Sequence, residues 1–164
     1  MKSPRILGID PGSRITGFGV IEQKGFHNEY VSCGVIKSNL DFTLPDRLKE
    51  MYEGICEVIE TYQPDHAAIE NVFVAKNPNS ALKLGQARGV LMLAVRQYQI
   101  DLYEYSAKVV KQAVVGYGQA DKHQIQQAVR ALLKLSSTPS QDAADALAVA
   151  MCCSNHLAVS HNVS

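Results

Sequence analysis

Residues 5–23 read RILGIDPGSRITGFGVIEQ, and this stretch decides the fold class. A short apolar run ends at Asp10 and is closed by Pro11-Gly12-Ser13, which is a strong turn signal. A second run rich in β-forming residues follows at residues 16–23, and a third follows at residues 29–37 after a glycine-containing turn. The three runs predict an antiparallel meander of strands at the start of the chain.

Helical and strand-like segments alternate after the meander. Apolar residues recur every three or four positions over residues 45–62, which predicts an amphipathic helix that ends before Pro64. Residues 65–70 are typical of a buried parallel strand, and residues 102–105 predict a fifth strand. Further helices are expected at residues 79–97, 107–115, 122–134 and from Pro139 onward. This order predicts an α/β domain in which helices flank a mixed five-stranded sheet.

The length and composition fit a single compact domain. At 164 residues with 46% hydrophobic side chains, the chain can bury a substantial core. We expect one domain over residues 1–155 and a flexible C-terminal tail over residues 156–164. No apolar run reaches the ~18 residues of a membrane span. The N-terminus does not read as a secretory signal either, so we expect a cytoplasmic protein.

The cysteines do not predict a disulfide scaffold. They contain no C-x-x-C pair, and two adjacent cysteines cannot easily bridge each other. The spacing of the adjacent pair with the two following histidines matches no common zinc pattern, so we interpret these residues as packing and tail. The residues concerned are Cys33, Cys56, Cys152, Cys153, His156 and His161.

The last helix has a clear start signal. Thr138 is the expected cap, Pro139 the first helical residue, and Gln141 lies three residues after the cap, as in a capping box. Asp142 and Asp145 follow and project from one face, near the positive end of the helix dipole.

The helix at residues 79–97 carries Gly85 and Gly89 four apart on one face. Each glycine costs about 1 kcal/mol in a helix interior, which indicates that a second backbone or DNA approaches there. We expect Asn79 or Ser80 to cap this helix. The expected packing residues are Leu82, Leu84, Val90, Leu91, Leu93 and Val95.

Four acids lie in apolar surroundings, where a carboxylate is normally excluded: Asp10, Glu70, Asp142 and Asp145. Burying an ionised carboxylate costs several kcal/mol unless a positive charge meets it, so the four predict a shared cationic partner. Oxygen ligands suit hard ions such as Mg²⁺ or Mn²⁺ better than zinc. Two such ions, roughly 4 Å apart, can support hydrolysis of a phosphodiester. The pattern predicts a metal-dependent nuclease centre.

The charge distribution agrees with a nucleic-acid substrate, although the formal net charge is zero. Residues 1–70 carry 7 basic and 11 acidic side chains, whereas residues 71–141 carry 9 basic and 3 acidic ones. The middle of the chain therefore forms a basic surface beside the acids, as expected where phosphates bind. A solvated basic face without a partner remains the alternative on charge alone.

Three strings resemble the RuvC family of Holliday-junction resolvases: ILGIDPGSRITGFGVI (6–21), AIENVFVAKNPNSALKLGQARGV (68–90) and QDAADALAVA (141–150). The resemblance implies a ribonuclease-H-like fold and a homodimer. It also implies dependence on two Mg²⁺ ions per site, with Mn²⁺ as a substitute, and paired symmetric nicks with 5′-phosphates across a four-way DNA junction. The RuvA-RuvB branch-migration complex is the implied partner.

The resemblance also assigns site residues. Asp10, Glu70, Asp142 and Asp145 match the catalytic metal ligands, and the third of these is histidine in some members, so Asp142 is the least essential. Lys111 and Lys122 match the basic residues near the scissile phosphate, and a cation there would stabilise developing charge. Without the resemblance, both would be read as solvated helix lysines.

Further DNA contacts are implied less strongly. Phe73 matches an aromatic residue that stacks on an unpaired base, although it would also be an ordinary core phenylalanine. Arg14, Lys76, Lys83 and Arg88 are candidates for contacts with the DNA backbone. The chain departs from the family pattern at its end, because residues 152–164 contain no lysine or arginine.

Three other functions are compatible with parts of this sequence. Asp10-Pro11-Gly12 is also compatible with the first phosphate loop of an actin-type or hexokinase-type ATPase, but the chain has no second glycine-rich loop. A junction-binding module without activity is disfavoured by four intact acids. An RNA-directed nuclease of the same fold would prefer an RNA-DNA hybrid over the junction.

Overall fold

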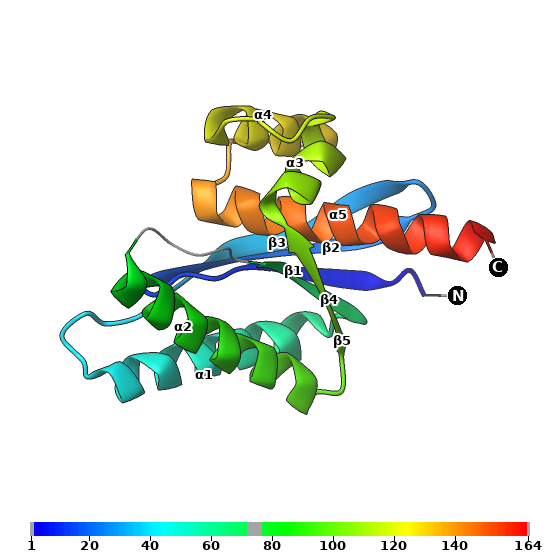
Figure 1. Ribbon diagram of the computed structural model, residues 1–164. Coiled ribbons are helices and arrows are strands. Elements are labelled where there is room, and N and C mark those ends of the chain that lie inside the picture. Colours follow the sequence, from blue (N-terminus) through cyan, green and yellow to red (C-terminus); the bar gives the residue numbers. More distant parts are fainter. Residues whose placement is uncertain (1, 72–76, 164) are drawn as a thin grey trace.

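The computed structural model describes residues 2–71 and 77–163 and places one five-stranded sheet at the centre (Figure 1). The strand order is β3-β2-β1-β4-β5. β1 pairs antiparallel with β2 and parallel with β4, which makes the sheet mixed, as expected. The strands are β1 (Arg5–Asp10), β2 (Ile15–Lys24), β3 (His27–Lys37), β4 (His66–Asn71) and β5 (Asp101–Ser106).

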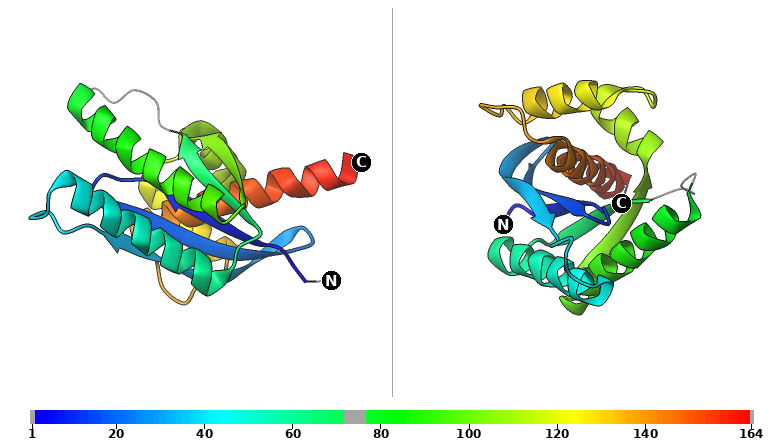
Figure 2. Two further views of the ribbon diagram at one scale, coloured as in Figure 1. Left: turned by 90° about the horizontal axis from the view of Figure 1, so that it is seen from below. Right: turned by 90° about the vertical axis from the view of Figure 1, so that its left-hand side faces the viewer.

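Helices cover both faces of the sheet. One face packs against α1 (Leu44–Tyr62) and α2 (Pro78–Gln97), and the other packs against α5 (Gln141–Val163). Beyond α5 lie α3 (Ala107–Val115) and α4 (Lys122–Leu132), which form an outer layer (Figure 2). Each face therefore has its own hydrophobic core, with Ile6 and Ala68 on the α5 side and Leu7 and Ile69 on the other.

Glycines let α5 lie directly on the sheet. A Cβ atom at Gly8 would stand 2.0 Å from the carbonyl oxygen of Ala146, and one at Gly17 would stand 2.1 Å from that of Asp142. Only a residue without a side chain permits such a close approach of strand and helix backbones. These contacts fix the start of α5 over the carboxyl end of β1.

The start of α5 differs from the expected capping box. The helix begins at Gln141, and the Ser140 hydroxyl accepts a hydrogen bond from the Ala143 N–H (3.3 Å). The Thr138 hydroxyl instead accepts a hydrogen bond from Arg130, so it is engaged away from the helix. The prediction of Thr138 as the cap was therefore wrong, because a tertiary contact outcompetes the local motif.

The other end of α5 also differs from expectation. The helix continues through Val163, so most of the segment expected to be a flexible tail, residues 156–164, is helical. By length and hydropathy, residues 141–162 would also qualify as a membrane span. Within the domain, however, Leu147 and Val149 on this helix are buried in the core against the sheet, as in the central helix of a globular protein.

α2 begins at Pro78, one residue earlier than expected. Asn77 is the cap, because its side chain accepts a hydrogen bond from the Asn79 N–H (3.0 Å), and Pro78 follows in the first turn. Neither Asn79 nor Ser80 is the cap. Two of the expected packing residues of this helix, Leu82 and Leu93, are instead exposed, by 64% and 58%.

Candidate active site

The sheet brings two of the predicted acids to one edge. β1 and β4 are parallel neighbours whose last paired residues are Ile9 and Ile69. Asp10 and Glu70 come one residue later on each strand, so they lie side by side at the carboxyl ends of the strands and both line one cavity. Carboxyl ends of adjacent parallel strands are a recurrent place for ligand sites.

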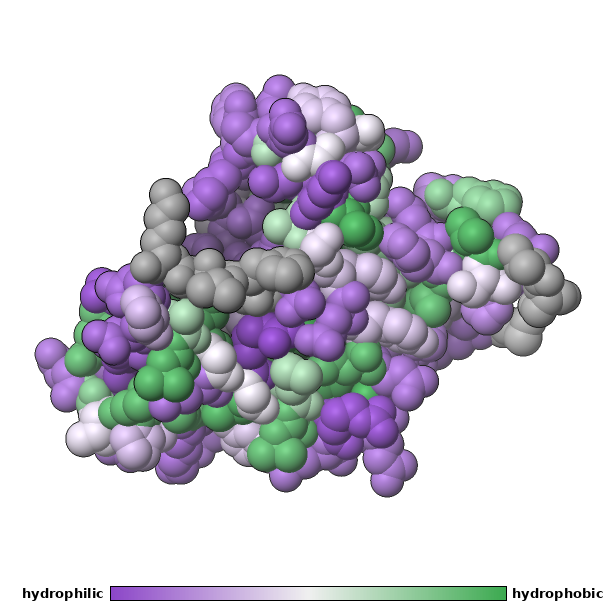
Figure 3. Space-filling view, in the orientation of Figure 1, coloured by the Kyte–Doolittle hydropathy of each residue, from purple (hydrophilic) through white to green (hydrophobic). Residues whose placement is uncertain are grey.

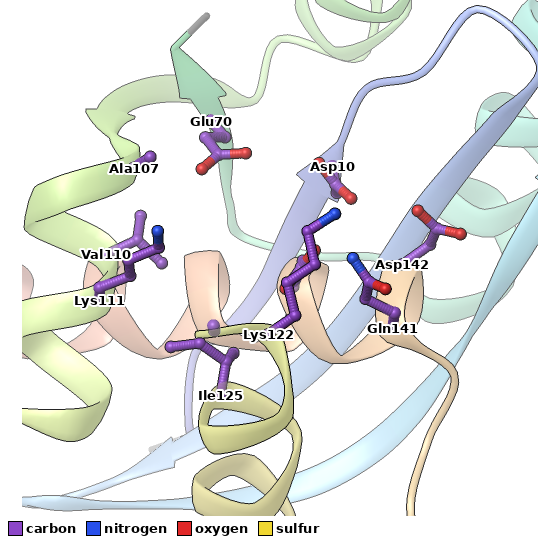
Figure 4. A pocket seen from close by; sticks show the side chains of 11 residues that line it. Asp10, Glu70, Ala107, Val110, Lys111, Lys122, Ile125, Gln141 and Asp142 are labelled. Atoms are coloured by element: carbon purple, nitrogen blue, oxygen red, sulfur yellow. The ribbon is translucent and has the colours of Figure 1, made fainter. Parts of the chain in front are cut away.

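The first turn of α5 contributes the other two acids. Because α5 lies on β1 and β2, Asp142 and Asp145 extend over the same edge and meet Asp10 and Glu70 around one cavity of about 280 Å³ (Figure 4). All four acids named from the sequence are thus brought together. The cavity is lined by Asp10, Glu70, Ala107, Val110, Lys111, Lys122, Ile125, Gln141, Asp142, Asp145 and Ala148.

Two lysines reach the cavity from the outer layer of helices. Lys111 comes from α3 and Lys122 from the first residue of α4, and the ammonium group of Lys122 points toward Asp10 (Figure 4). Both positive charges oppose the rise in the pKa of Glu70 and of Asp145, as expected for cations facing acids. The sequence-based placement of these lysines beside the acids agrees with this geometry.

Three helices begin at the cavity. Ala107, Lys122 and Gln141 are the first residues of α3, α4 and α5, and all three line it. The N-terminal end of a helix carries a partial positive charge from its aligned peptide dipoles, so the three ends favour anions at this place. Two lysines and three helix starts therefore add positive potential to the cavity that the acids line.

Burial and mutual repulsion raise the pKa values of the acids. Burial is the largest cause of the rise in the pKa of Asp10 to about 8, and repulsion from Asp145, Glu70 and Asp142 follows. Burial, followed by repulsion from Glu70, raises the pKa of Asp145 to about 6. Burial likewise raises the pKa of Glu70. The lysines thus do not neutralise the cluster, and hard cations would match its oxygen donors and its charge.

The carboxylates surround the cavity without closing on a single point. Across residues 2–71 and 77–163, no group of three or more His, Cys, Asp or Glu side chains is already arranged to hold a metal ion. The four acids therefore share one cavity, but their side chains do not converge on one set of coordination positions in this structure.

The other residues predicted to contact DNA differ in exposure and in pairing. Arg14 and Lys83 are exposed, on the turn after β1 and on α2. Arg88 donates to Glu104 and its side chain is only 16% exposed, so its guanidinium is engaged within the fold rather than offered to a phosphate. Phe73 and Lys76 lie outside the described residues.

Sequence reasoning missed Gln141 as a residue of the cavity. It was interpreted only as part of the capping box, whereas its amide lies beside Asp142 and Lys122 (Figure 4). The usable signal was its place directly before two acids at a helix start, where backbone and side chains both turn toward the carboxyl edge of the sheet.

Known proteins are similar to this chain in sequence. A family model for the crossover junction endodeoxyribonuclease RuvC matches residues 6–153. The chain is 58% identical over 146 residues to the crossover junction endodeoxyribonuclease RuvC of Photorhabdus laumondii, covering 89% of this chain and 84% of that protein. It is 55% identical over 150 residues to the protein of the same description from Vibrio cholerae, covering 92% and 86%.

Solved structures share the fold. RuvC from Thermus thermophilus in complex with a Holliday junction substrate matches with a TM-score of 0.89 at 28% identity over 96% of each chain. The yeast mitochondrial Holliday junction resolvase Ydc2 matches with a TM-score of 0.71 at 14% identity, over 98% of this chain and 82% of that one, which shows the fold alone. These likenesses confirm the expected ribonuclease-H-like α/β fold.

Proposed function

Because the chain belongs to the RuvC family of crossover junction endodeoxyribonucleases, we propose that the carboxylate cavity is where it cuts DNA. The protein is an endonuclease that resolves Holliday junctions. The single observation that supports the location is the convergence of Asp10, Glu70, Asp142 and Asp145 with two lysines around one cavity. We assign this activity to one domain, residues 1–155.

Membership of this nuclease family implies the use of a divalent metal. We propose Mg²⁺, two ions per site with Mn²⁺ as a substitute, held by the four carboxylates. The fit rests on four hard oxygen donors around one cavity. Burial and mutual repulsion raise the pKa of Asp10, so a cation bound there would favour its ionised form. Such ions supply the Lewis acidity that in-line phosphodiester displacement requires.

The chain's own residues would orient the substrate and balance charge. Lys111 and Lys122 face the acids across the cavity, which the scissile phosphate must enter. We assign them the stabilisation of negative charge that develops on that phosphate, a role worth several kcal/mol when the cation is already in place. The starts of α3, α4 and α5 add the positive ends of their helix dipoles to the same region.

A second copy of the chain is proposed on α2. Leu82, Gly85, Gly89 and Leu93 recur every three or four residues and form one exposed stripe, called here the α2 stripe. Apolar surface runs along α2 in Figure 3, and a Cβ at either glycine would meet nothing within 4 Å. A self-complementary stripe with two glycines suits close packing of two copies about a two-fold axis.

Two copies would explain symmetric cleavage. A four-way junction has two strands to cut, and a two-fold dimer presents two carboxylate cavities related by the same symmetry. Leu93→Asp should convert the dimer to a monomer in analytical ultracentrifugation and leave single nicks in place of paired ones. Ser80→Asp, at an exposed position on the same helix outside the stripe, is the matched control. A dimeric Leu93→Asp protein would contradict this interface.

The remaining assignments rest on the family resemblance. We propose that Phe73 stacks on an unpaired base and that Arg14, Lys76 and Lys83 contact the DNA backbone. Arg88 is a weaker candidate because it is paired with Glu104. We also propose the RuvA-RuvB complex as the partner. The family implies an intracellular, non-membrane protein, which we place in the cytoplasm.

A junction cleavage assay tests the proposed function. With Mg²⁺ present, a synthetic four-way junction should yield two symmetric nicks bearing 5′-phosphates, and Ca²⁺ or EDTA should prevent cutting. Asp10→Asn should still bind the junction but not cleave it, since only a ligand charge is removed. Preference for an RNA-DNA hybrid would point to the RNA-directed alternative, and junction binding without any cutting would point to a binding module.

A further inference from the structure

A set of side-chain hydrogen bonds ties α4 to the segment that leads into α5. The Gln126 amide Nε2 donates to the carbonyl oxygen of Pro139 (3.2 Å). The Arg130 guanidinium donates from Nη2 to the carbonyl oxygen of Ser136 (3.3 Å) and from Nη1 to the Thr138 hydroxyl (3.2 Å). These three bonds, called here the α4 brace, hold residues 136–139 against the side of the helix.

The brace lies on the same face of α4 as the lysine of the cavity. Lys122, Gln126 and Arg130 are spaced by four residues, so they form one line along the helix. The first of them extends into the cavity, and the other two grip the segment that is followed directly by Gln141 and Asp142. The brace therefore joins the element that carries a cation to the element that carries two acids.

Apolar packing alone defines the position of α4 less well than packing together with the α4 brace. Ile125 and Val129 are buried against α5 in the shared core. Such contacts are non-directional, so they resist separation of the helices better than a small slide or rotation. Directional bonds from a planar guanidinium and an amide specify the register of α4 against the start of α5.

We propose that Arg130 and Gln126 are positioning residues that set the place of Lys122 relative to Asp142 and Asp145 through the α4 brace. Neither residue lines the cavity, and both donate to the segment 136–139, so each acts through Lys122 rather than on the scissile phosphate. The inference rests on the proposed role of Lys122 in cleavage. A cation misplaced by about 1 Å loses much of its effect on a transition state.

The test measures single-turnover cleavage of a four-way junction in Mg²⁺, together with junction affinity in Ca²⁺. Arg130→Ala should slow cleavage about tenfold and Gln126→Ala about threefold, with affinity within about twofold of the starting protein. Arg130→Lys keeps the positive charge but replaces the two guanidinium nitrogens that bond Ser136 and Thr138 with one ammonium nitrogen, so its rate should fall between those of Arg130→Ala and the starting protein.

A double-mutant cycle separates positioning from general stability. If Arg130 acts through Lys122, then Arg130→Ala in a Lys122→Ala background should cost less than about twofold. Arg5→Ala is the matched control, because Arg5 also donates to a backbone carbonyl, that of Tyr62 (2.9 Å), at the start of β1 away from the cavity. It should lower the melting temperature and leave the cleavage rate unchanged.

Specific outcomes would overturn the proposal. They are a native-like Arg130→Ala protein that cuts at the starting rate, an additive loss in the double variant, or an equal loss in Arg5→Ala. If Arg130→Ala does not fold, Gln126→Ala carries the same cycle with Lys122→Ala. A Lys122→Ala protein with full activity would instead refute the proposed role of that lysine, and with it the premise of the brace.

Discussion

Replacing Asp10 with asparagine should stabilise the metal-free protein while abolishing cleavage. The ionised side chain sits among three other acids at the end of β1, and burial there raises its pKa from 3.8 to about 8. Asparagine keeps the shape of the side chain and removes the charge. The substitution therefore isolates the electrostatic cost of keeping the site ready for a cation.

The size and sign of the effect follow from proton linkage. A carboxyl whose pKa is higher in the folded protein than in the unfolded chain binds its proton more tightly when folded, so its contribution to stability falls as pH rises from about 4 to about 8. The difference between a pKa of 3.8 and one of about 8, at about 1.4 kcal/mol for each pH unit, sets an upper limit of about 5 to 6 kcal/mol on the gain in stability. Water that enters the cavity offsets part of this, so we expect about 2 to 3 kcal/mol.

Thermal and urea unfolding in EDTA measure the gain. For a chain of this length, about 2 to 3 kcal/mol corresponds to a rise in melting temperature of about 5 to 10 °C. The gain should be full at pH 8 and above and small at pH 5, where the native carboxyl is already protonated. Mg²⁺ should stabilise the starting protein more than the variant.

Two results would refute this reasoning. The first is an Asp10→Asn protein that is no more stable than the starting protein at alkaline pH in EDTA. The second is a gain of equal size at all pH values, which would show that charge is not its cause. Asp41→Asn, an exposed acid far from the cavity in the loop before α1, is the matched control and should change little.

Three further changes test other parts of the site. Lys111→Ala should lower the single-turnover cleavage rate about a hundredfold with little change in junction affinity, and an unchanged rate would exclude Lys111 from the reaction. Gly8→Ala should destabilise the fold by more than about 3 kcal/mol in urea unfolding, because its Cβ would stand 2.0 Å from the Ala146 carbonyl oxygen; a stable variant would show that α5 can shift. Cleavage at limiting Mg²⁺ should rise between about pH 6 and about pH 8 as Asp145 and then Asp10 lose protons, and more Mg²⁺ should shift the midpoint to lower pH; a flat profile would mean that protons do not compete with the metal.

Local patterns were sufficient for several elements, among them the strand that carries Asp10. The apolar run closed by Pro11-Gly12-Ser13 predicted β1 and its end at Asp10, and helical periodicity predicted α1 and α3 within one or two residues of their observed bounds. These elements depend on turn chemistry and on the spacing of apolar residues, which are encoded within a few neighbours along the chain. Acids in apolar surroundings likewise stood out because desolvation makes them costly.

Contacts between distant segments decided what local patterns could not. Thr138 has the chemistry of a cap, but Arg130 takes its hydroxyl and the helix begins at Gln141 instead. Leu82 and Leu93 fit a packing pattern, yet they lie on the side of α2 that faces away from the sheet. Periodicity identifies an apolar face, but whether the same chain covers that face depends on the tertiary arrangement.

By itself, the sequence determined which residues could hold a metal, in what order the strands and helices come, and to which family the chain is similar. Only the tertiary structure decided that three helix starts and two lysines meet the four carboxylates at one edge of the sheet. The physical reason is that a desolvation cost belongs to each acid separately. The positive potential that offsets this cost is a sum over segments that lie about a hundred residues or more from Asp10 in the sequence, and only folding brings those segments together.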